Sequence, residues 1–179
     1  MIVLVQASYF LYSLVIDINS LLTSGIINLV DSNFFLLTAD NITNLGLQLF
    51  FGLIYGLTLL ITIVMLSIRY IIVSVGVVFI PLGIFFFFIP PLKDYGKLIF
   101  NFLGICIFTT FIDSLIFLAG SKLSGLDVWQ DFKILVMISS FGIANLAMLY
   151  FILFSAIKSA LSAGDKISGT IVSVAKYFA

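Results

Sequence analysis

The sequence predicts an all-α protein that crosses a membrane several times. Of its 179 residues, 63% are hydrophobic and 9% are charged, whereas a soluble domain carries about 25% charged residues. The apolar residues form continuous runs, not the alternation expected of a membrane barrel. Continuous runs of about 20 residues are long enough to span a bilayer as helices. We therefore expect one membrane domain, residues 1–179, with an N-terminal part (1–44), a four-helix transmembrane core (45–157) and an amphipathic tail (158–179).

The N-terminal part holds one apolar run and one polar segment. Residues 2–16 are apolar up to Asp17, and this length fits either a transmembrane helix or an interfacial helix. Residues 17–44 contain acidic residues but no Lys or Arg. Their apolar residues recur near helical spacing, which predicts an amphipathic helix on the membrane surface. A loop then leads to the next helix, with Thr43 or Asn44 as its N-cap.

The core begins with the most apolar stretch of the chain, residues 45–92, which contains a single charge, Arg69. This stretch is long enough for two crossings. We expect a transmembrane hairpin that reverses near Arg69. Together with two later apolar runs, it gives four clear spans: residues 45–67, 70–89, 98–120 and 134–157.

Glycine and proline mark special positions in this hairpin. Gly52 and Gly56 form a small-xxx-small pair, which would let another helix approach closely, although glycine is also common in membrane helices for no such reason. Pro81 removes a backbone hydrogen bond inside the second arm, which predicts a kink or break there. Pro90 ends that arm, and residues 92–97 form a short basic loop.

Asp113 is the one acidic residue well inside a predicted span. Ionisable residues in a membrane are costly and are candidates for function. If Arg69 lies at the reversal, its side chain would reach down to Asp113 on the third span. We therefore expect an Arg69–Asp113 contact, which would either tie the helices together or form part of a proton or ion path.

The composition excludes several enzyme classes. The chain has no His and no Glu, so Ser-His and Cys-His nucleophiles and His-ligated metal centres cannot be built. An aspartic protease needs two facing Asp residues within spans, and only Asp113 qualifies. Cys106 lies in an apolar run and is expected to be core packing. We expect no catalytic residue, metal or cofactor, and no enzyme.

The basic residues give a weak orientation signal. With five crossings, one side carries Arg69, Lys122 and Lys133, and the other carries Lys93, Lys97, Lys158, Lys166 and Lys176. Because cytoplasmic loops are enriched in Lys and Arg, we expect a multi-pass protein of the cell (inner) membrane with a cytoplasmic C-terminus. The lysine-free segment 17–44 would then lie on the same side as the larger group of lysines, which is a conflict.

One order of features runs through residues 60–120. An apolar helix ends at Arg69, an apolar run with Pro81 and Gly83 follows, and Pro90 closes it before a lysine-bearing loop and another span. In this order the segment resembles the TrbL-like polytopic inner-membrane subunits of type IV secretion (conjugation) machines. Within that group it is most similar to the archaeal CedA-type membrane protein of DNA import.

The resemblance implies a non-enzymatic channel or platform subunit of a DNA transfer or import apparatus. Such a subunit would lie in the lipid bilayer as a homo-oligomer, beside other membrane subunits, pilin-like proteins and a separate motor ATPase. DNA would be translocated cargo only, and a ring of subunits would supply basic residues to the lumen: Lys93 and Lys97, or Lys122 and Lys133. The alternative from the residues themselves is a small-solute or ion transporter that uses the Pro81-broken helix and Asp113.

Overall fold

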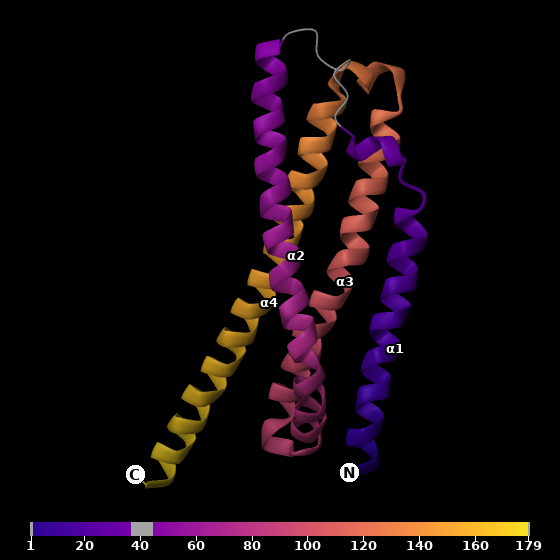
Figure 1. Cartoon of the computed structure of the whole chain (residues 1–179). Coiled ribbons are helices and arrows are strands. Elements are labelled where there is room, and N and C mark those ends of the chain that lie inside the picture. The colour runs from indigo at the N-terminus through magenta and orange to yellow at the C-terminus, as the bar shows by residue number, and fades with distance from the viewer. Residues whose placement is uncertain (1, 37–44, 179) are drawn as a thin grey trace.

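A computed structural model describes residues 2–36 and 45–178, and all regular elements in these ranges are helical (Figure 1). The predicted all-α fold class is therefore confirmed. Four long helices are joined by shorter 3-10 helices. The long helices are α1 (Ile2–Ile27), α2 (Leu45–Phe88), α3 (Lys93–Ser124) and α4 (Lys133–Phe178), and the short ones are η1 (Ser32–Phe35), η3 (Pro90–Leu92) and η4 (Asp127–Phe132).

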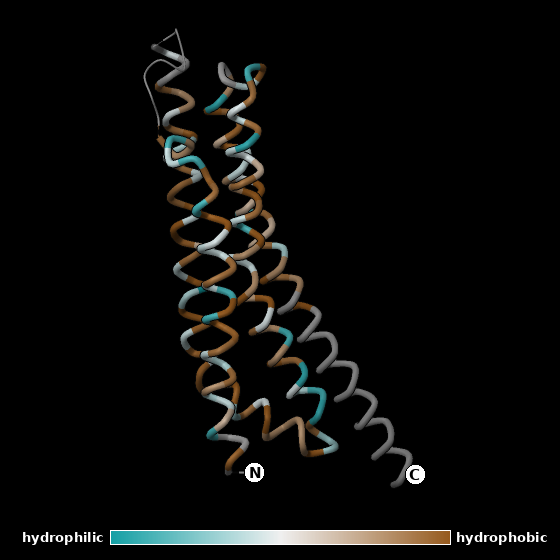
Figure 2. The backbone as a smooth tube through the Cα atoms, turned by 90° about the vertical axis from the view of Figure 1, so that its right-hand side faces the viewer, coloured by the Kyte–Doolittle hydropathy of each residue, from teal (hydrophilic) through white to brown (hydrophobic). Residues whose placement is uncertain are grey.

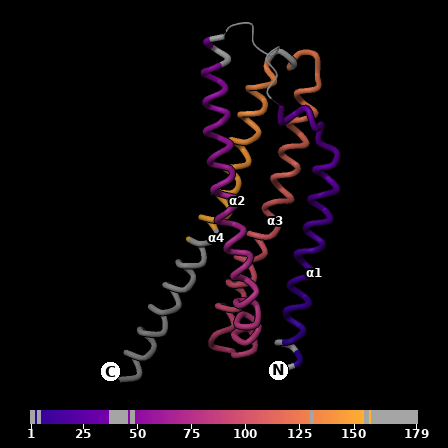
Figure 3. The backbone as a smooth tube through the Cα atoms, viewed as in Figure 1, coloured from indigo at the N-terminus to yellow at the C-terminus, as the bar shows by residue number. Residues whose placement is uncertain are grey.

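The four long helices run alternately up and down, so both chain ends lie at the same end of the molecule (Figure 1, Figure 3). Helix α3 contacts all three other long helices and is the centre of the bundle. The α2–α3 turn lies at the same end as the two termini, whereas the α1–α2 and α3–α4 connections lie at the other.

Each long helix contains a segment long and apolar enough to cross a membrane, and apolar residues dominate along the coloured parts of these helices (Figure 2). The chain is thus a multi-pass helical membrane protein by length and composition. The candidate spans are Gln6–Ile27, Leu49–Phe88, Pro90–Ser124 and Lys133–Phe154.

The predicted reversal at Arg69 is wrong. The expected spans 45–67 and 70–89 are one helix, α2, of 44 residues. The segment around Arg69 has no glycine or proline to turn the chain, and a single charge does not end a helix when its side chain finds partners inside the protein. The actual turn comes at Pro90, where η3 connects α2 to α3.

The prediction of a surface helix after Asp17 is also wrong. Helix α1 continues through Asp17 to Ile27, and its segment Gln6–Ile27 is long and apolar enough to span a membrane, which fits the spanning alternative in a longer form. The polar residues are tolerated because Asn19 is buried and hydrogen-bonded to α3. The predicted caps Thr43 and Asn44 lie outside the described residues.

Two smaller predictions also fail. Helix α2 continues through Pro81, so the predicted break is absent, whereas a kink is compatible with a continuous helix. The expected loop at residues 92–97 is mostly the first turn of α3, which begins at Lys93. The tail from residue 158 onward continues α4, which ends at Phe178, and its amphipathic character stays a prediction.

The core at the connection end is aromatic. Phe34 of η1 is 1% exposed, and it packs in one cluster with Tyr55 of α2 and Phe141 of α4. The ring of Phe141 lies 4.8 Å from that of Phe117 on α3 and 5.7 Å from that of Tyr55, centroid to centroid. The Tyr55–Phe141 pair is edge-on and the Phe117–Phe141 pair is tilted, and aromatic pairs add about 0.5–1.5 kcal/mol each beyond area burial. Segment η1 thus anchors α2, α3 and α4 to one another.

Candidate functional site

Arg69 ties α2 to α3 at the middle of the bundle. Its Nε donates to the carbonyl oxygen of Cys106 at 2.7 Å, and its Nη2 donates to the carbonyl oxygen of Ile107 at 3.3 Å and to Thr110 Oγ1 at 3.2 Å. Hydrogen bonds from a charged donor are worth about 1.5–3 kcal/mol each. The expected tie between Arg69 and the helix that carries Asp113 therefore exists.

The partner within that tie was predicted wrongly. Arg69 forms no ion pair with Asp113, and both carboxylate oxygens of Asp113 lack a hydrogen-bond partner among the described residues. The reason is the position of Arg69 in mid-helix rather than at a turn. It lies at the level of Cys106 to Thr110, and Asp113 is a further turn along α3, about 5 Å of rise beyond Thr110.

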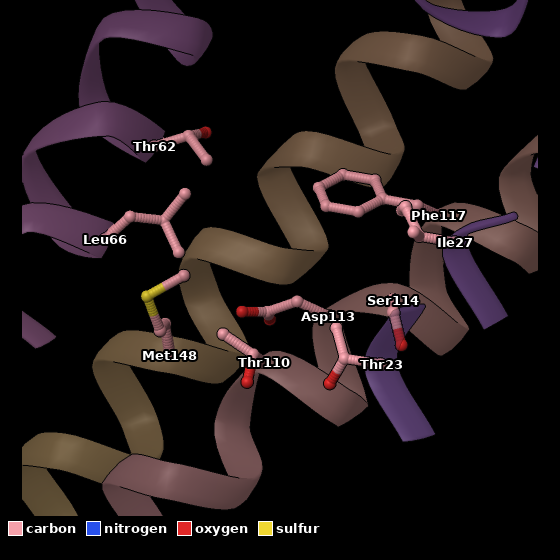
Figure 4. A pocket seen from close by; sticks show the side chains of 9 residues that line it. All are labelled: Thr23, Ile27, Thr62, Leu66, Thr110, Asp113, Ser114, Phe117 and Met148. Carbon is pink, nitrogen blue, oxygen red and sulfur yellow. The ribbon is translucent and has the colours of Figure 1, made fainter. Parts of the chain in front are cut away.

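Asp113 borders a pocket that residues of all four long helices line. The cavity has a volume of about 150 Å³. Asp113 is only 4% exposed, and its carboxylate points toward Leu66 of α2 and Met148 of α4 (Figure 4). The lining residues are Thr23, Ile27, Thr62, Leu66, Thr110, Asp113, Ser114, Phe117 and Met148.

Three of the hydroxyl groups around this cavity, those of Thr62, Thr110 and Ser114, donate to helix carbonyls, whereas Thr23 Oγ1 has no hydrogen-bond partner among the described residues. Thr62 Oγ1 donates to the carbonyl of Thr58 at 2.8 Å, and Ser114 Oγ donates to that of Phe111 at 2.7 Å. Thr110 Oγ1 donates to the carbonyl of Ile107 and accepts from Asn19 Nδ2 and Arg69. Hydroxyls that bond back to their own helix tend to bend it.

In the described part of the chain, five buried side-chain oxygens have no hydrogen-bond partner. They are Asn19 Oδ1, Thr23 Oγ1, Asn145 Oδ1 and both carboxylate oxygens of Asp113. Buried polar groups are normally hydrogen-bonded, and an unpaired one costs about 1–3 kcal/mol. Four of these five atoms are amide or carboxylate oxygens and only Thr23 carries a hydroxyl proton, so acceptors outnumber donors here, and water, a proton or a cation would satisfy them. It offers no nucleophile–base pair, and no group of three or more His, Cys, Asp or Glu lies together in the described part of the chain.

The predicted glycine pair does not meet another helix of this chain. A Cβ added at Gly52 or Gly56 would have no described atom within 4 Å. The close approach occurs instead between Gly83 and Gly96, where a Cβ on Gly96 would lie 2.6 Å from the carbonyl oxygen of Gly83. This crossing holds α2 and α3 together close to the turn between them, which begins at Pro90.

The four candidate lysines lie at opposite ends of the bundle. At the α2–α3 turn, the Lys93 ammonium lies 5.3 Å from the centre of the Phe87 ring, and Lys97 pairs with Asp94 at 3.6 Å. At the other end, Lys122 is exposed, and Lys133 Nζ donates to the carbonyl oxygen of Asn33 at 2.7 Å. The pair Lys93 and Lys97 and the pair Lys122 and Lys133 therefore cannot line a lumen at the same level.

Sequence reasoning missed a line of polar residues on the outer face of α1. All of its members are exposed, and we call them the α1 polar line: Gln6, Ser13, Asp17, Ser20 and Ser24. Their spacing of 7, 4, 3 and 4 residues was the available signal, since residues so spaced share one helix face. The predicted helix boundary at Asp17 divided the line in two and hid it.

The chain matches no known protein family, no curated protein and no solved structure in comparisons with each.

Proposed function

We propose that the chain is a non-enzymatic channel or platform subunit of a type IV secretion-like DNA transfer apparatus, acting as an oligomer with a separate motor ATPase. Two kinds of support lead to this proposal. One is the resemblance carried by the order of Arg69, Pro81, Gly83 and Pro90. The other is the exposed apolar length of α2, which calls for partner subunits.

The apolar part of α2 is too long for a bilayer. Leu49–Phe88 comprises 40 residues and rises about 60 Å, twice the roughly 30 Å of a hydrocarbon core. A tilt of about 60° would be needed to bury it in lipid, whereas membrane helices tilt by about 0–40°. Most of its side chains are exposed, for example Leu53 (74%) and Val78 (71%). The surplus apolar surface therefore calls for cover by other protein, as in an assembly.

The corrected topology also supports an orientation. With four crossings, the termini and the α2–α3 turn share one end (Figure 1). That end carries five lysines, and the other carries two; the five are Lys93, Lys97, Lys158, Lys166 and Lys176, and the two are Lys122 and Lys133. The lysine-free stretch after α1 now lies on the side of the membrane opposite the five lysines. The conflict in the five-crossing prediction, which placed this stretch on the same side as those lysines, therefore disappears. By the positive-inside rule both termini are cytoplasmic, on the side where a motor ATPase would act.

Copy number tests this proposal. The tagged chain would be purified in lipid nanodiscs and examined by native mass spectrometry and electron microscopy, with co-purifying proteins identified. We expect one defined homo-oligomer. A monodisperse monomer that co-purifies with no partner would refute the proposal.

Bulky substitutions would show where α2 is covered. Leu53→Trp and Val78→Trp lie toward opposite ends of its apolar part, and both sites are open in a single chain. Because 60 Å of helix cannot all face lipid, at least one variant should disrupt the oligomer. A tryptophan at a site that faces lipid should leave the oligomer intact. The variant that does not disrupt the oligomer therefore serves as the control for the one that does. If both variants assemble normally, α2 is not covered by protein at either end.

A second candidate function is an ion transporter centred on Asp113. The observation that favours it is the cavity that brings all four long helices to one unpartnered carboxylate. The Pro81 break that would have supported it is absent, since α2 is continuous there. Flux of protons and alkali cations into liposomes should fall at least tenfold in Asp113→Asn, and the loop variant Asp127→Asn is the control. Unchanged flux in Asp113→Asn would exclude this candidate.

A further inference from the structure

The α1 polar line spans the membrane on the outside of the bundle. Gln6 and Ser24, its first and last members, are 18 residues apart and so about 27 Å along the helix axis. That distance is close to the thickness of a hydrocarbon core, about 30 Å. At 100° per residue, the five members fall within an arc of about 60°. Asp17, near the middle of the line, has no hydrogen bond or ion pair with any residue that the structure describes.

The packed face of α1 lies about 120° around the helix axis from the centre of the line, at 100° per residue, and fixes the direction of the line. Tyr12 is 5% exposed and donates a hydrogen bond to the carbonyl oxygen of Val73 on α2. Asn19 is 4% exposed and donates to Thr110 Oγ1 on α3 at 2.9 Å. These two contacts, 7 residues apart on one face, prevent α1 from rotating about its axis. The polar line therefore points away from the bundle.

A carboxylate at this depth cannot remain in contact with lipid, because ionisable residues inside a bilayer face other protein or water. Direct packing of two α1 helices about a shared axis along the membrane normal would place Asp17 against the Asp17 of the second copy, which is repulsive. A second copy also offers no exposed cation at mid-membrane among its described residues, since Arg69 is bonded to α3. Water is the partner that satisfies the line without these conflicts.

We propose that the α1 polar line faces a water-filled, cation-conducting path enclosed by several copies of this chain. The inference rests on the oligomer of the proposed function and adds what its subunits enclose. In a ring, the Asp17 carboxylates form a belt of negative charge, and such belts select for cations. The same belt repels a phosphate backbone, so DNA would not follow this path and would cross the assembly elsewhere.

Cysteine accessibility tests the inference. Ser13→Cys, Ser20→Cys and Ser24→Cys place thiols on the line, and Leu14→Cys and Leu21→Cys place them on the neighbouring exposed apolar face as matched controls. Cys106 is fully buried, so the native chain gives the background rate. Membrane-impermeant cationic and anionic methanethiosulfonates would be applied to both sides of proteoliposomes. We expect line positions to react at least tenfold faster than Leu14 and Leu21.

The charge of Asp17 gives a second readout. At Ser20→Cys, the cationic reagent should react several-fold faster than the anionic one, and adding Asp17→Asn should remove that difference. Equal rates at line and control positions would overturn the inference, as would a charge preference that survives Asp17→Asn. Native mass spectrometry of the same samples separates the two proposals. An intact oligomer with an unreactive line refutes only the aqueous path, whereas a monomer refutes the proposed function.

Discussion

Gly96 lies where the backbones of α2 and α3 touch, and this makes Gly96→Ala a sharp test of the bundle. The added Cβ would lie 2.6 Å from the carbonyl oxygen of Gly83 and 2.8 Å from the backbone nitrogen of Phe87. Both are backbone atoms and cannot swing aside as a side chain would. Overpacking of this kind costs about 1–3 kcal/mol, against a gain of about 0.5–1 kcal/mol for replacing a helical glycine by alanine. The net effect is a loss of up to about 2.5 kcal/mol.

Gly104→Ala is the matched control for this variant. Gly104 lies in the same helix, but a Cβ there would meet no described atom within 4 Å, so only the gain of about 0.5–1 kcal/mol remains. Thermal unfolding in detergent, followed by the fluorescence of Trp129, would measure both. At about 2–4 °C per kcal/mol for a chain of this size, Gly96→Ala should lower Tm by up to about 10 °C, and Gly104→Ala should hold or raise it. Equal Tm values for the two variants would refute the close crossing of α2 and α3.

Three further variants can be measured in the same assay. Arg69→Lys should lower stability by about 1.5–3 kcal/mol, because an ammonium cannot reproduce the forked bonds to two helix carbonyls; an unchanged Tm would contradict the tie to α3. Asp113→Asn should leave Tm unchanged or raise it, because it removes an unpaired buried charge while keeping the side-chain shape, and a large drop would mean that the carboxylate has a partner. Phe141→Ala should cost about 3–5 kcal/mol, because it removes the central ring of the aromatic cluster. A loss under 1 kcal/mol would show that η1 does not anchor the helices.

The fold class follows from composition because a bilayer leaves few choices. A chain with so few charges must bury its backbone polar groups in helices, so α3 and the first part of α4 were predicted within a few residues. The position of Asp113 inside a span was also predictable, since its neighbours on both sides are apolar. These features depend on local sequence alone.

The helix count was not predictable from local sequence, because it depended on what one side chain contacts. From the sequence alone, a single charge at Arg69 in an apolar stretch indicates a turn, because the partners of its side chain are not known. Once its guanidinium reaches the carbonyls of Cys106 and Ile107, a charge in mid-helix is tolerable. The same applies to Asn19, whose bond to Thr110 allows α1 to continue past Asp17. Long-range contacts of this kind leave no trace in the spacing of apolar residues.

The α1 polar line was hidden for a different reason. Helix α1 carries polar residues on two faces: Ser8 and Asn19 are buried, whereas Ser13 and Asp17 are exposed. In the sequence, the residues of the two faces alternate along the chain, so together they look like one generally polar segment. Only the packing of one face against α2 and α3 separates the two sets.

The tie at Arg69 has a consequence for how the chain tolerates substitution. Two of its three bonds are accepted by main-chain oxygens of α3, and every amino acid supplies a main-chain oxygen. Changes at Cys106 or Ile107 would therefore leave the anchor intact as long as α3 stays helical, and only Thr110 contributes a side chain to it. Among the side chains of this tie, only Arg69 and Thr110 are therefore constrained, alongside the Gly83–Gly96 crossing that also holds α2 and α3 together.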